Sequence, residues 1–206
     1  MAETQIVTLA NGNKVVLEDD DSIFLSLISN GKVESTFQIP YPSGGYGGGM
    51  LLLSPSEQYL IFSYFSGESE EAFLLFGIEN GNLEPLYDSG YIYGEEANYC
   101  FLSEDKFLLQ TLRTDWWYPE TEKTDENGDK FYEFGQINIL NIETKTLDRH
   151  IIHVYPSDDW EEEITDNDLF LFSEMINDNS FNVTMPWGKE TFHYPLKKII
   201  DIRIKE

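Results

Sequence analysis

Two stretches of this sequence combine large aromatic side chains with carboxylates at close spacing. The first is Trp116-Trp117-Tyr118, which follows Asp115 directly, and the second is Asp158-Asp159-Trp160-Glu161-Glu162-Glu163. Carboxylates form charge-assisted hydrogen bonds with Lys and Arg, and Trp and Tyr are enriched among the residues that dominate protein interfaces. Both stretches therefore predict recognition of a cationic surface. The alternative is that the rings pack beneath their own loops.

Residues that often act as metal ligands or nucleophiles lack the spacing that such chemistry needs. His150 and His153 lie three apart in an expected strand, so they point to opposite faces and cannot share a metal ion there. Cys100, the single cysteine, falls in another expected strand, which favours a core residue over a nucleophile. We therefore expect no catalytic residues and no enzymatic activity.

One acidic segment resembles the start of a calcium-binding loop. It reads Asp125-Glu126-Asn127-Gly128-Asp129, but Lys130 stands where the EF-hand loop requires Gly, and Gln136 stands where it requires Glu. The segment therefore indicates a flexible acidic loop, and we expect no cofactor. Weak Ca²⁺ binding somewhere among the acidic loops is an alternative that the sequence leaves open.

The overall charge narrows the class of partner. The chain has 206 residues with 38 acidic and 13 basic side chains, which gives a formal net charge of -25. Contacts to nucleic acid or to an anionic membrane need clustered Lys and Arg, so neither partner is expected, whereas a basic protein is attracted. With 41% hydrophobic and 15% aromatic residues, the chain is globular, and we expect a single domain over residues 1–206.

The sequence shows no targeting segment. Its start, MAETQIVTLANGNK, lacks the basic and long apolar regions of a signal peptide, and no apolar run reaches the roughly 18 residues of a spanning helix. We therefore expect a soluble, cytoplasmic protein.

The elements that position these residues repeat along the chain. Hairpin turns recur at Asn30-Gly31, Asn80-Gly81 and Thr144-Lys145, and the strand after each turn ends at Tyr41-Pro42-Ser43, Tyr87-Asp88-Ser89 or Tyr155-Pro156-Ser157. Four units follow, at approximately 1–43, 44–89, 90–157 and 158–206, with little helix. The expected strands are Gln5–Leu9, Lys14–Leu17, Ser22–Ile28 and Val33–Ile39; Met50–Leu53, Tyr59–Phe65, Ala72–Ile78 and Leu83–Tyr87; Asn98–Leu102, Lys106–Leu112, Phe134–Leu140 and Leu147–Tyr155; and Glu163–Thr165, Leu169–Met175, Phe181–Met185 and Thr191–Ile204.

The second strand of the second unit, Tyr59–Phe65, carries apolar residues on both faces. Strands buried on both faces are typical of stacked propeller blades. The element Ser54-Pro55-Ser56-Glu57-Gln58-Tyr59-Leu60-Ile61-Phe62 resembles the Ser-Pro-Asp-Gly-Lys-Tyr-Leu-φ-Phe element of WD40-like propeller blades, without the Gly-His and Trp-Asp signatures. We predict an all-β, small β-propeller-like repeat of about four four-stranded units. The alternative is a twisted β-sandwich or an open array of hairpins.

In such a repeat, the loops fall on two faces. The links from second to third strands, and from each unit to the next, hold 21 of the 38 acids, whereas the hairpin turns hold acids partly balanced by Lys. The alternative is that acids simply occupy loops in an acidic protein. The residues expected to contact a partner are Trp116, Trp117, Tyr118, Asp158, Asp159, Trp160, Glu161, Glu162, Glu163, Glu68, Glu70 and Glu71.

Charge and aromatic content together favour a non-enzymatic binding protein that engages a basic protein partner through one loop face. The most specific form of this hypothesis is an immunity protein or inhibitor that covers the cationic site of a toxin or nuclease. Two other classes compete with it: a carbohydrate-binding or glycan-processing propeller, and a structural scaffold whose charge maintains solubility.

Overall fold

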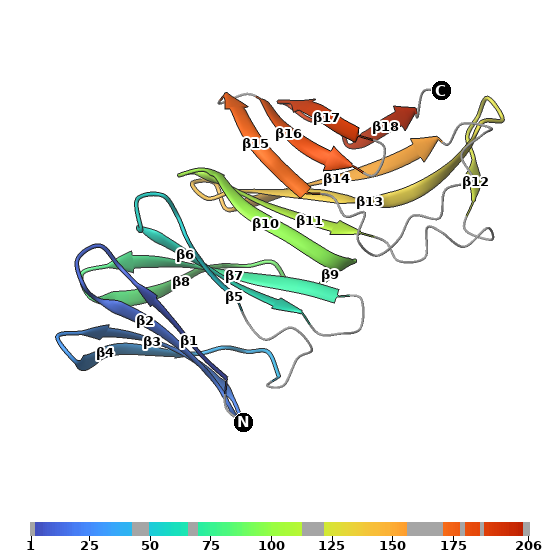
Figure 1. Ribbon diagram of the computed structural model, residues 1–206. Helices are drawn as coiled ribbons and strands as arrows, with labels where there is room; N and C mark the ends of the chain where they lie inside the picture. Colours follow the sequence, from blue (N-terminus) through green and yellow to red (C-terminus); the bar gives the residue numbers. More distant parts are fainter. Residues whose placement is uncertain are drawn as a thin grey trace. The chain divides into compact units, whose positions relative to one another are not determined.

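The computed structural model describes residues 3–42, 50–65, 70–112, 122–155, 171–177, 180–185 and 188–203. Every regular element in these ranges is a β-strand (Figure 1). The chain separates into two compact units, Met1–Ile92 (unit 1) and Tyr93–Glu206 (unit 2). The division lies close to the boundary expected between the second and third repeats.

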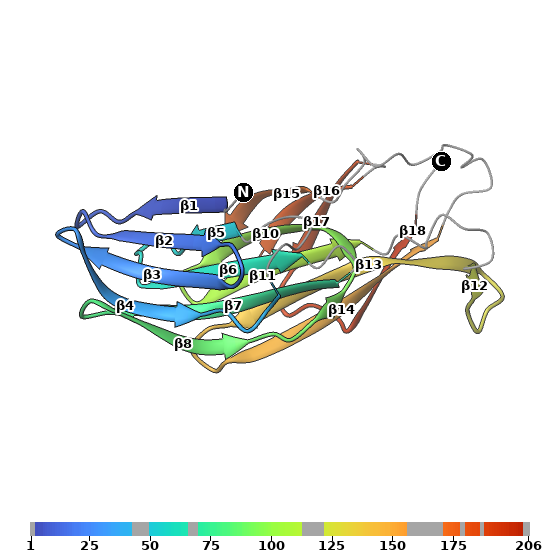
Figure 2. The ribbon, with the colours of Figure 1, turned by 90° about the horizontal axis from the view of Figure 1, so that it is seen from below.

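Unit 1 contains two antiparallel sheets, each a simple meander (Figure 2). The first has the order β1-β2-β3-β4, and the second has the order β5-β6-β7-β8, with β9 also pairing with β7. The strands are β1 (Glu3–Thr8), β2 (Lys14–Asp19), β3 (Ile23–Ser29), β4 (Lys32–Gln38), β5 (Met50–Leu53), β6 (Tyr59–Phe65), β7 (Glu70–Glu79), β8 (Asn82–Asp88) and β9 (Ile92–Tyr93).

Unit 2 contains the third and fourth sheets. The third has the order β10-β11-β13-β14-β18, with β12 pairing with β13, and the fourth has the order β15-β16-β17. The strands are β10 (Glu95–Ser103), β11 (Lys106–Leu112), β12 (Lys123–Thr124), β13 (Lys130–Asn141), β14 (Thr146–Tyr155), β15 (Leu171–Asn177), β16 (Ser180–Met185), β17 (Gly188–His193) and β18 (Ile199–Arg203).

The prediction of an all-β chain with a small repeated sheet is confirmed. The described strands form four sheets built on consecutive antiparallel meanders, as in a propeller-like repeat, and β18 departs from this order. An open array of hairpins has the same order of sheets. The Asn-Gly turns also form as predicted. Asn30 and Gly31 have φ values of 50° and 75°, and Asn80 and Gly81 have values of 50° and 79°. Positive φ at both central residues matches the twist of the flanking strands.

The core of unit 1 lies between its two sheets. Leu25 and Leu27 of β3 are fully buried against Leu60 and Phe62 of β6 in one apolar cluster. β6 is buried on both faces, as its sequence predicts, because Ile61 is as inaccessible to solvent as its neighbours Leu60 and Phe62. Truncating a buried Phe of this kind typically costs about 3–5 kcal/mol.

Direct contacts fix how the two sheets of unit 1 pack against each other. The Phe37 ring packs edge-on against Phe76 at 5.1 Å between centroids, and the Leu83 backbone N–H donates to the Ser35 hydroxyl at 3.1 Å. These contacts join β4 to the second sheet. As a result, the loops at each end of the first sheet lie beside the loops at the corresponding end of the second sheet.

The prediction of one strand over Thr191–Ile204 is wrong. The segment forms two strands, β17 and β18, and β18 leaves the fourth sheet to pair in parallel with β14. Pro195 lies between them, and proline has no N–H with which to continue a sheet ladder. The third strand of the third unit also begins earlier than predicted, at Lys130, because β12 pairs with it to form a hairpin.

Candidate binding site

Most of the residues predicted to contact a partner lie outside the described residues. These are Glu68, Trp116, Trp117, Tyr118, Asp158, Asp159, Trp160, Glu161, Glu162 and Glu163. Glu70 and Glu71 are described, at the start of β7. Glu70 is half-buried, but Glu71 is only 4% exposed, so its side chain does not reach the surface as a contact residue must.

Unit 1 has two chemically different ends. The β1–β2 and β5–β6 hairpins meet at one end, where the Ala10 N–H donates to the Glu57 carboxylate at 2.7 Å. The β2–β3 link, which carries Asp19, Asp20 and Asp21, lies at the opposite end of these strands, as do the segments that follow β4 and β8. We call these the hairpin end and the acid-loop end of unit 1.

Three tyrosines pack together at the acid-loop end of unit 1. The rings of Tyr41 and Tyr64 stack at 5.1 Å with an interplanar angle of 9°, and Tyr91 lies 5.5 Å from Tyr41 at 59°. Tyr64 is buried at 2% exposure, Tyr41 is half-buried, and Tyr91 is 45% exposed. The cluster therefore extends from the core to the surface and presents one ring to solvent.

Asp88 accepts two hydrogen bonds beside this cluster. Its Oδ1 atom accepts from the Tyr41 hydroxyl at 2.7 Å and from the Gly90 N–H at 2.8 Å. Burial, together with the hydrogen bond to Asp88 and the charge of Asp88, raises the pKa of Tyr41 well above its usual value. Tyr41 therefore remains a protonated donor at neutral pH and holds the exposed Asp88 carboxylate in a fixed orientation.

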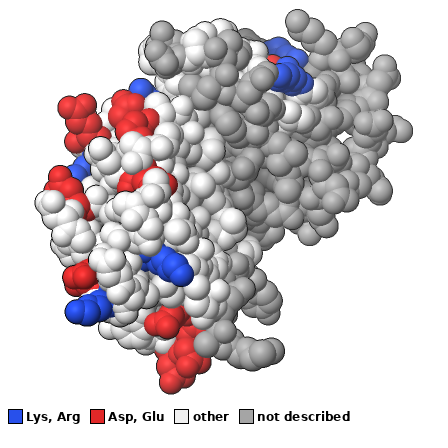
Figure 3. All heavy atoms as spheres, turned by 60° about the vertical axis from the view of Figure 1, so that its left-hand side comes forward, with Lys and Arg blue, Asp and Glu red and all other residues white. Residues whose placement is uncertain are grey.

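The charges of unit 1 are unevenly placed. Residues 1–92 contain thirteen acidic residues (Glu3, Glu18, Asp19, Asp20, Asp21, Glu34, Glu57, Glu68, Glu70, Glu71, Glu79, Glu84 and Asp88) and two basic residues (Lys14 and Lys32). Both lysines begin strands that leave the hairpin end. Figure 3 brings forward the left-hand side of Figure 1, where these hairpins lie, and Lys and Arg side chains are interspersed there among Asp and Glu. The acid-loop end has no basic residue of its own.

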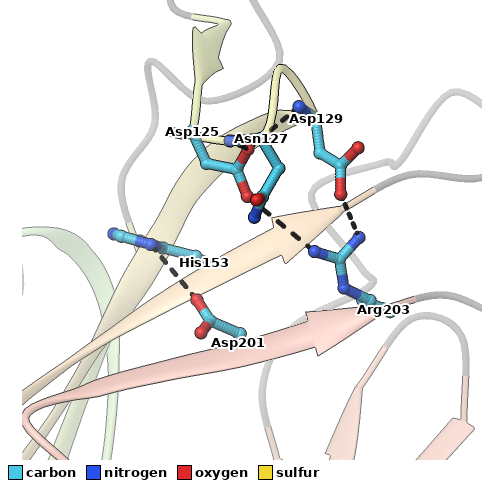
Figure 4. A network of polar contacts seen from close by, with 6 residues as sticks. All are labelled: Asp125, Asn127, Asp129, His153, Asp201 and Arg203. Carbon is cyan, nitrogen blue, oxygen red and sulfur yellow. Dashed lines mark hydrogen bonds and ion pairs between the residues drawn. The ribbon is translucent and has the colours of Figure 1, made fainter.

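In unit 2, several acids of the described segment 122–133 pair with basic side chains of the same unit. Arg203 of β18 lies 2.8 Å from Asp129 and 3.9 Å from Asp125 (Figure 4). Its guanidinium also lies 4.1 Å from the centroid of the Tyr155 ring. Nearby, Lys123 pairs with Glu133 at 2.5 Å and Lys130 pairs with Glu122 at 2.9 Å.

The segment that resembles a calcium loop forms the turn of the β12–β13 hairpin. Asp125 Oδ1 accepts from the N–H groups of Asn127 and Asp129 at 2.8 and 2.9 Å. Desolvation raises the pKa of Asp125, but these backbone hydrogen bonds and the Arg203 charge outweigh it and leave the pKa below its usual value. The described residues contain no group of three or more His, Cys, Asp or Glu side chains arranged to hold a metal ion.

The two histidines of β14 lie on opposite faces, as their spacing predicts. His150 Nδ1 lies 2.8 Å from the Lys197 carbonyl oxygen, whereas His153 lies against the Phe131 ring and 3.5 Å from Asp201 (Figure 4). Cys100 of β10 packs against the core of unit 2, and burial raises the pKa of its thiol to about 12. In the described ranges no helix has the length and hydrophobicity needed to cross a membrane.

The residues that sequence reasoning missed are Tyr64, Tyr91 and Arg203. Tyr41 and Asp88 belong to the element that recurs at the end of each fourth strand. That repetition was the signal in the sequence that could have pointed to these two residues. Arg203 gave no signal, because the sequence predicted residues 191–204 as one strand of the fourth unit and did not indicate the pairing of β18 with β14.

Comparisons with known proteins identify no family. No family model matches the sequence, and no curated protein matches it. Among solved structures, TolB from Acinetobacter baumannii is similar over 96% of this chain and 56% of that chain, at 10% sequence identity and a TM-score of 0.34. This chain spans little more than half the length of that protein. A similarity at this level carries no functional information.

Proposed function

We propose that this protein is a non-enzymatic binding protein that engages a basic protein through its acidic loops, with the acid-loop end of unit 1 as a principal contact. The observation that carries the proposal is the placement of charge in unit 1. Its two lysines begin at the hairpin end, while Asp19, Asp20 and Asp21 lie at the other end. In unit 2, three basic side chains already pair with acids of its described acidic loop.

The negative charge of the acid-loop end affects how fast a cationic partner associates. An uncompensated negative surface steers a cationic partner and raises its association rate by about 10 to 10³, an effect that salt screens. Affinity then requires desolvated aromatic anchors. Trp116, Trp117, Tyr118 and Trp160, which lie outside the described residues, are the proposed anchors, together with the exposed Tyr91.

The specific form of the proposal is an inhibitor or immunity protein that covers the cationic site of a toxin or nuclease. An enzyme that binds nucleic acid needs clustered Lys and Arg at its site, and that cluster is the surface that an acidic protein with few basic groups matches.

The test is capture of basic proteins on the immobilised full chain, followed by stopped-flow association of the purified partner at about 25 and 300 mM NaCl, which spans strong changes in screening. A triple variant, Asp19→Asn, Asp20→Asn and Asp21→Asn, is compared with a control, Glu34→Gln, Glu79→Gln and Glu84→Gln. Both remove three charges from unit 1. The control acids are exposed and lie towards the hairpin end.

At low salt, the first variant is expected to slow association at least about fivefold more than the control. Equal slowing by both variants would show that the acid-loop end has no special role. Capture of no basic protein would reject the proposal, and glycan binding in its place would support the carbohydrate alternative.

A further inference from the structure

We infer that Asp88, with the Tyr91 and Tyr41 rings, forms a binding site for a single arginine side chain supplied by a partner. The inference rests on the proposed function, because it names the group that the acid-loop end of unit 1 recognises. It stands on four observations: a fixed carboxylate with a free oxygen, an exposed ring beside it, the absence of a cation in unit 1 to fill the site, and an arginine held by a tyrosine and an aspartate in unit 2.

The Asp88 carboxylate is oriented before any ligand arrives. Its Oδ1 atom already accepts from Tyr41 and Gly90, while its Oδ2 atom accepts no hydrogen bond within the described residues. The turn that carries it is also held in place, since the Ser89 hydroxyl accepts from the Phe73 N–H at 2.9 Å and donates to the Gly90 carbonyl at 2.6 Å. A guanidinium can therefore donate to Oδ2 without breaking an existing bond.

The aromatic surface beside Asp88 is equally well supported. Tyr91 exposes 45% of its surface and rests against Tyr41, which is stacked on the buried Tyr64. A cation over a tyrosine face within about 6 Å gains electrostatic stabilisation, and the planar guanidinium of arginine can stack on a ring and form directed hydrogen bonds at once. This geometry favours arginine over lysine.

No side chain of unit 1 can act as the cation for this site. Lys14 and Lys32 are the only basic residues in residues 1–92, and both begin at the hairpin end. Unit 1 itself therefore supplies no countercharge to Asp88.

Unit 2 contains an arginine held between a tyrosine ring and a carboxylate. The tyrosine, Tyr155, ends β14, whereas the aspartate, Asp129, lies in the β12–β13 turn. Arg203 pairs with Asp129 at 2.8 Å (Figure 4). The same guanidinium lies over the Tyr155 ring at 4.1 Å. In unit 1, Tyr41, Tyr91 and Asp88 supply rings and a carboxylate from other positions of the fold, and no arginine occurs in residues 1–92. The Arg203 example in unit 2 indicates that arginine is the side chain that would fill the Asp88 site in unit 1.

The test is a titration of the ¹⁵N-labelled full chain with N-acetyl-arginine amide, followed by amide chemical shifts, with N-acetyl-lysine amide as the matched probe. The amides of Gly90 and Tyr91 are expected to shift in a saturable way, with at least about threefold weaker binding of the lysine probe. Asp88→Asn and Tyr91→Ala should each weaken arginine binding at least about fivefold. Glu84→Gln, which removes an exposed carboxylate from the same strand, should leave it unchanged.

Asp88→Asn keeps an oxygen that can accept from Tyr41, and unchanged shifts of the Tyr41 and Phe73 amides verify that each variant is folded. Shifts confined to other regions, or equal binding by Asp88→Asn, Tyr91→Ala and the wild type, would overturn the inference. The outcome is separable from that of the proposed function. If a captured basic partner binds the wild type and both variants equally, this site is rejected while the proposed function stands. If the arginine probe binds but no basic partner is captured, the site stands and the proposed function fails.

Discussion

Arg203 of β18 and Asp129 of the β12–β13 turn form an ion pair at 2.8 Å, although they lie in segments far apart in the sequence. The same guanidinium covers the Tyr155 ring at 4.1 Å. One side chain thus connects the last described strand of the chain to the turn of the β12–β13 hairpin.

Replacing Arg203 should loosen this hairpin more than it destabilises the whole unit. An exposed ion pair contributes little, and an exposed cation–π contact contributes about 0.5–1 kcal/mol, so Arg203→Ala should cost about 1 kcal/mol. The measurement is urea unfolding followed by Trp fluorescence, because all four Trp residues belong to unit 2. Arg149→Ala, which removes an exposed arginine of β14, is the control and should change the midpoint by less than half as much.

The hydrogen bonds to Asp125 predict a pH dependence for the β12–β13 turn. The folded-state pKa of Asp125 is lowered by the backbone donors and by Arg203, against the opposing effect of desolvation. A lowered folded pKa gives stabilisation that is complete above the unfolded pKa of about 3.9 and is lost as pH falls through the folded value. Amide exchange at Asn127 and Asp129 should therefore remain slow at pH 5 and become faster below about pH 4, beyond the intrinsic pH effect on exchange. Asp125→Asn should show no such transition, and an identical transition in that variant would assign it to another group.

Glu57 carries backbone strain and a structural contact at once. Its φ is 60°, a conformation that favours glycine, and its carboxylate accepts from the Ala10 N–H at 2.7 Å. Glu57→Ala loses the hydrogen bond and keeps the strain, so it should cost about 1 kcal/mol, whereas Glu57→Gly relieves the strain and should stay within about 0.5 kcal/mol of the wild type. Urea unfolding followed by circular dichroism gives the order of stability. In both variants amide exchange at Ala10 should accelerate; protection as in the wild type would remove Glu57 from this role.

Cys100 should react slowly in the folded protein. Burial raises its thiol pKa from 9.0 to about 12, which lowers the thiolate fraction near neutral pH by about 10³. Labelling by a thiol-specific disulfide reagent at pH 8 should be slower than in 6 M guanidinium by roughly this factor. Equal rates in the two conditions would mean that the thiol is exposed and ionises normally.

The repeated hairpins could be predicted because their signals are local. Asn30-Gly31 and Asn80-Gly81 adopt the positive φ values that two-residue turns require, and Tyr59–Phe65 is buried on both faces as its composition indicates. Each of these depends only on neighbouring residues. The strands of unit 1 accordingly fall within a few residues of their predicted positions.

Long-range pairing could not be predicted in the same way. Whether β18 continues the fourth sheet or joins β14 depends on which edge is open, and the sequence of Ile199–Arg203 suits either neighbour. Pro195 indicated that the strand is interrupted, but it does not indicate which strand the following residues pair with. The Tyr41–Asp88 contact likewise depends on how the first and second sheets pack, so the tyrosine cluster emerged only from the fold.

The parallel pairing of β14 with β18 makes the fourth sheet an excursion that leaves the third sheet and returns to it. The ladder runs from Ile151–Ile199 to Tyr155–Arg203, and the Ile151 N–H also donates to the Lys198 carbonyl at 3.0 Å. A single nick in the backbone between Tyr155 and Lys198 would therefore leave two fragments held together side by side. Unit 2 should accordingly be reconstitutable from two separately made pieces that meet at this seam.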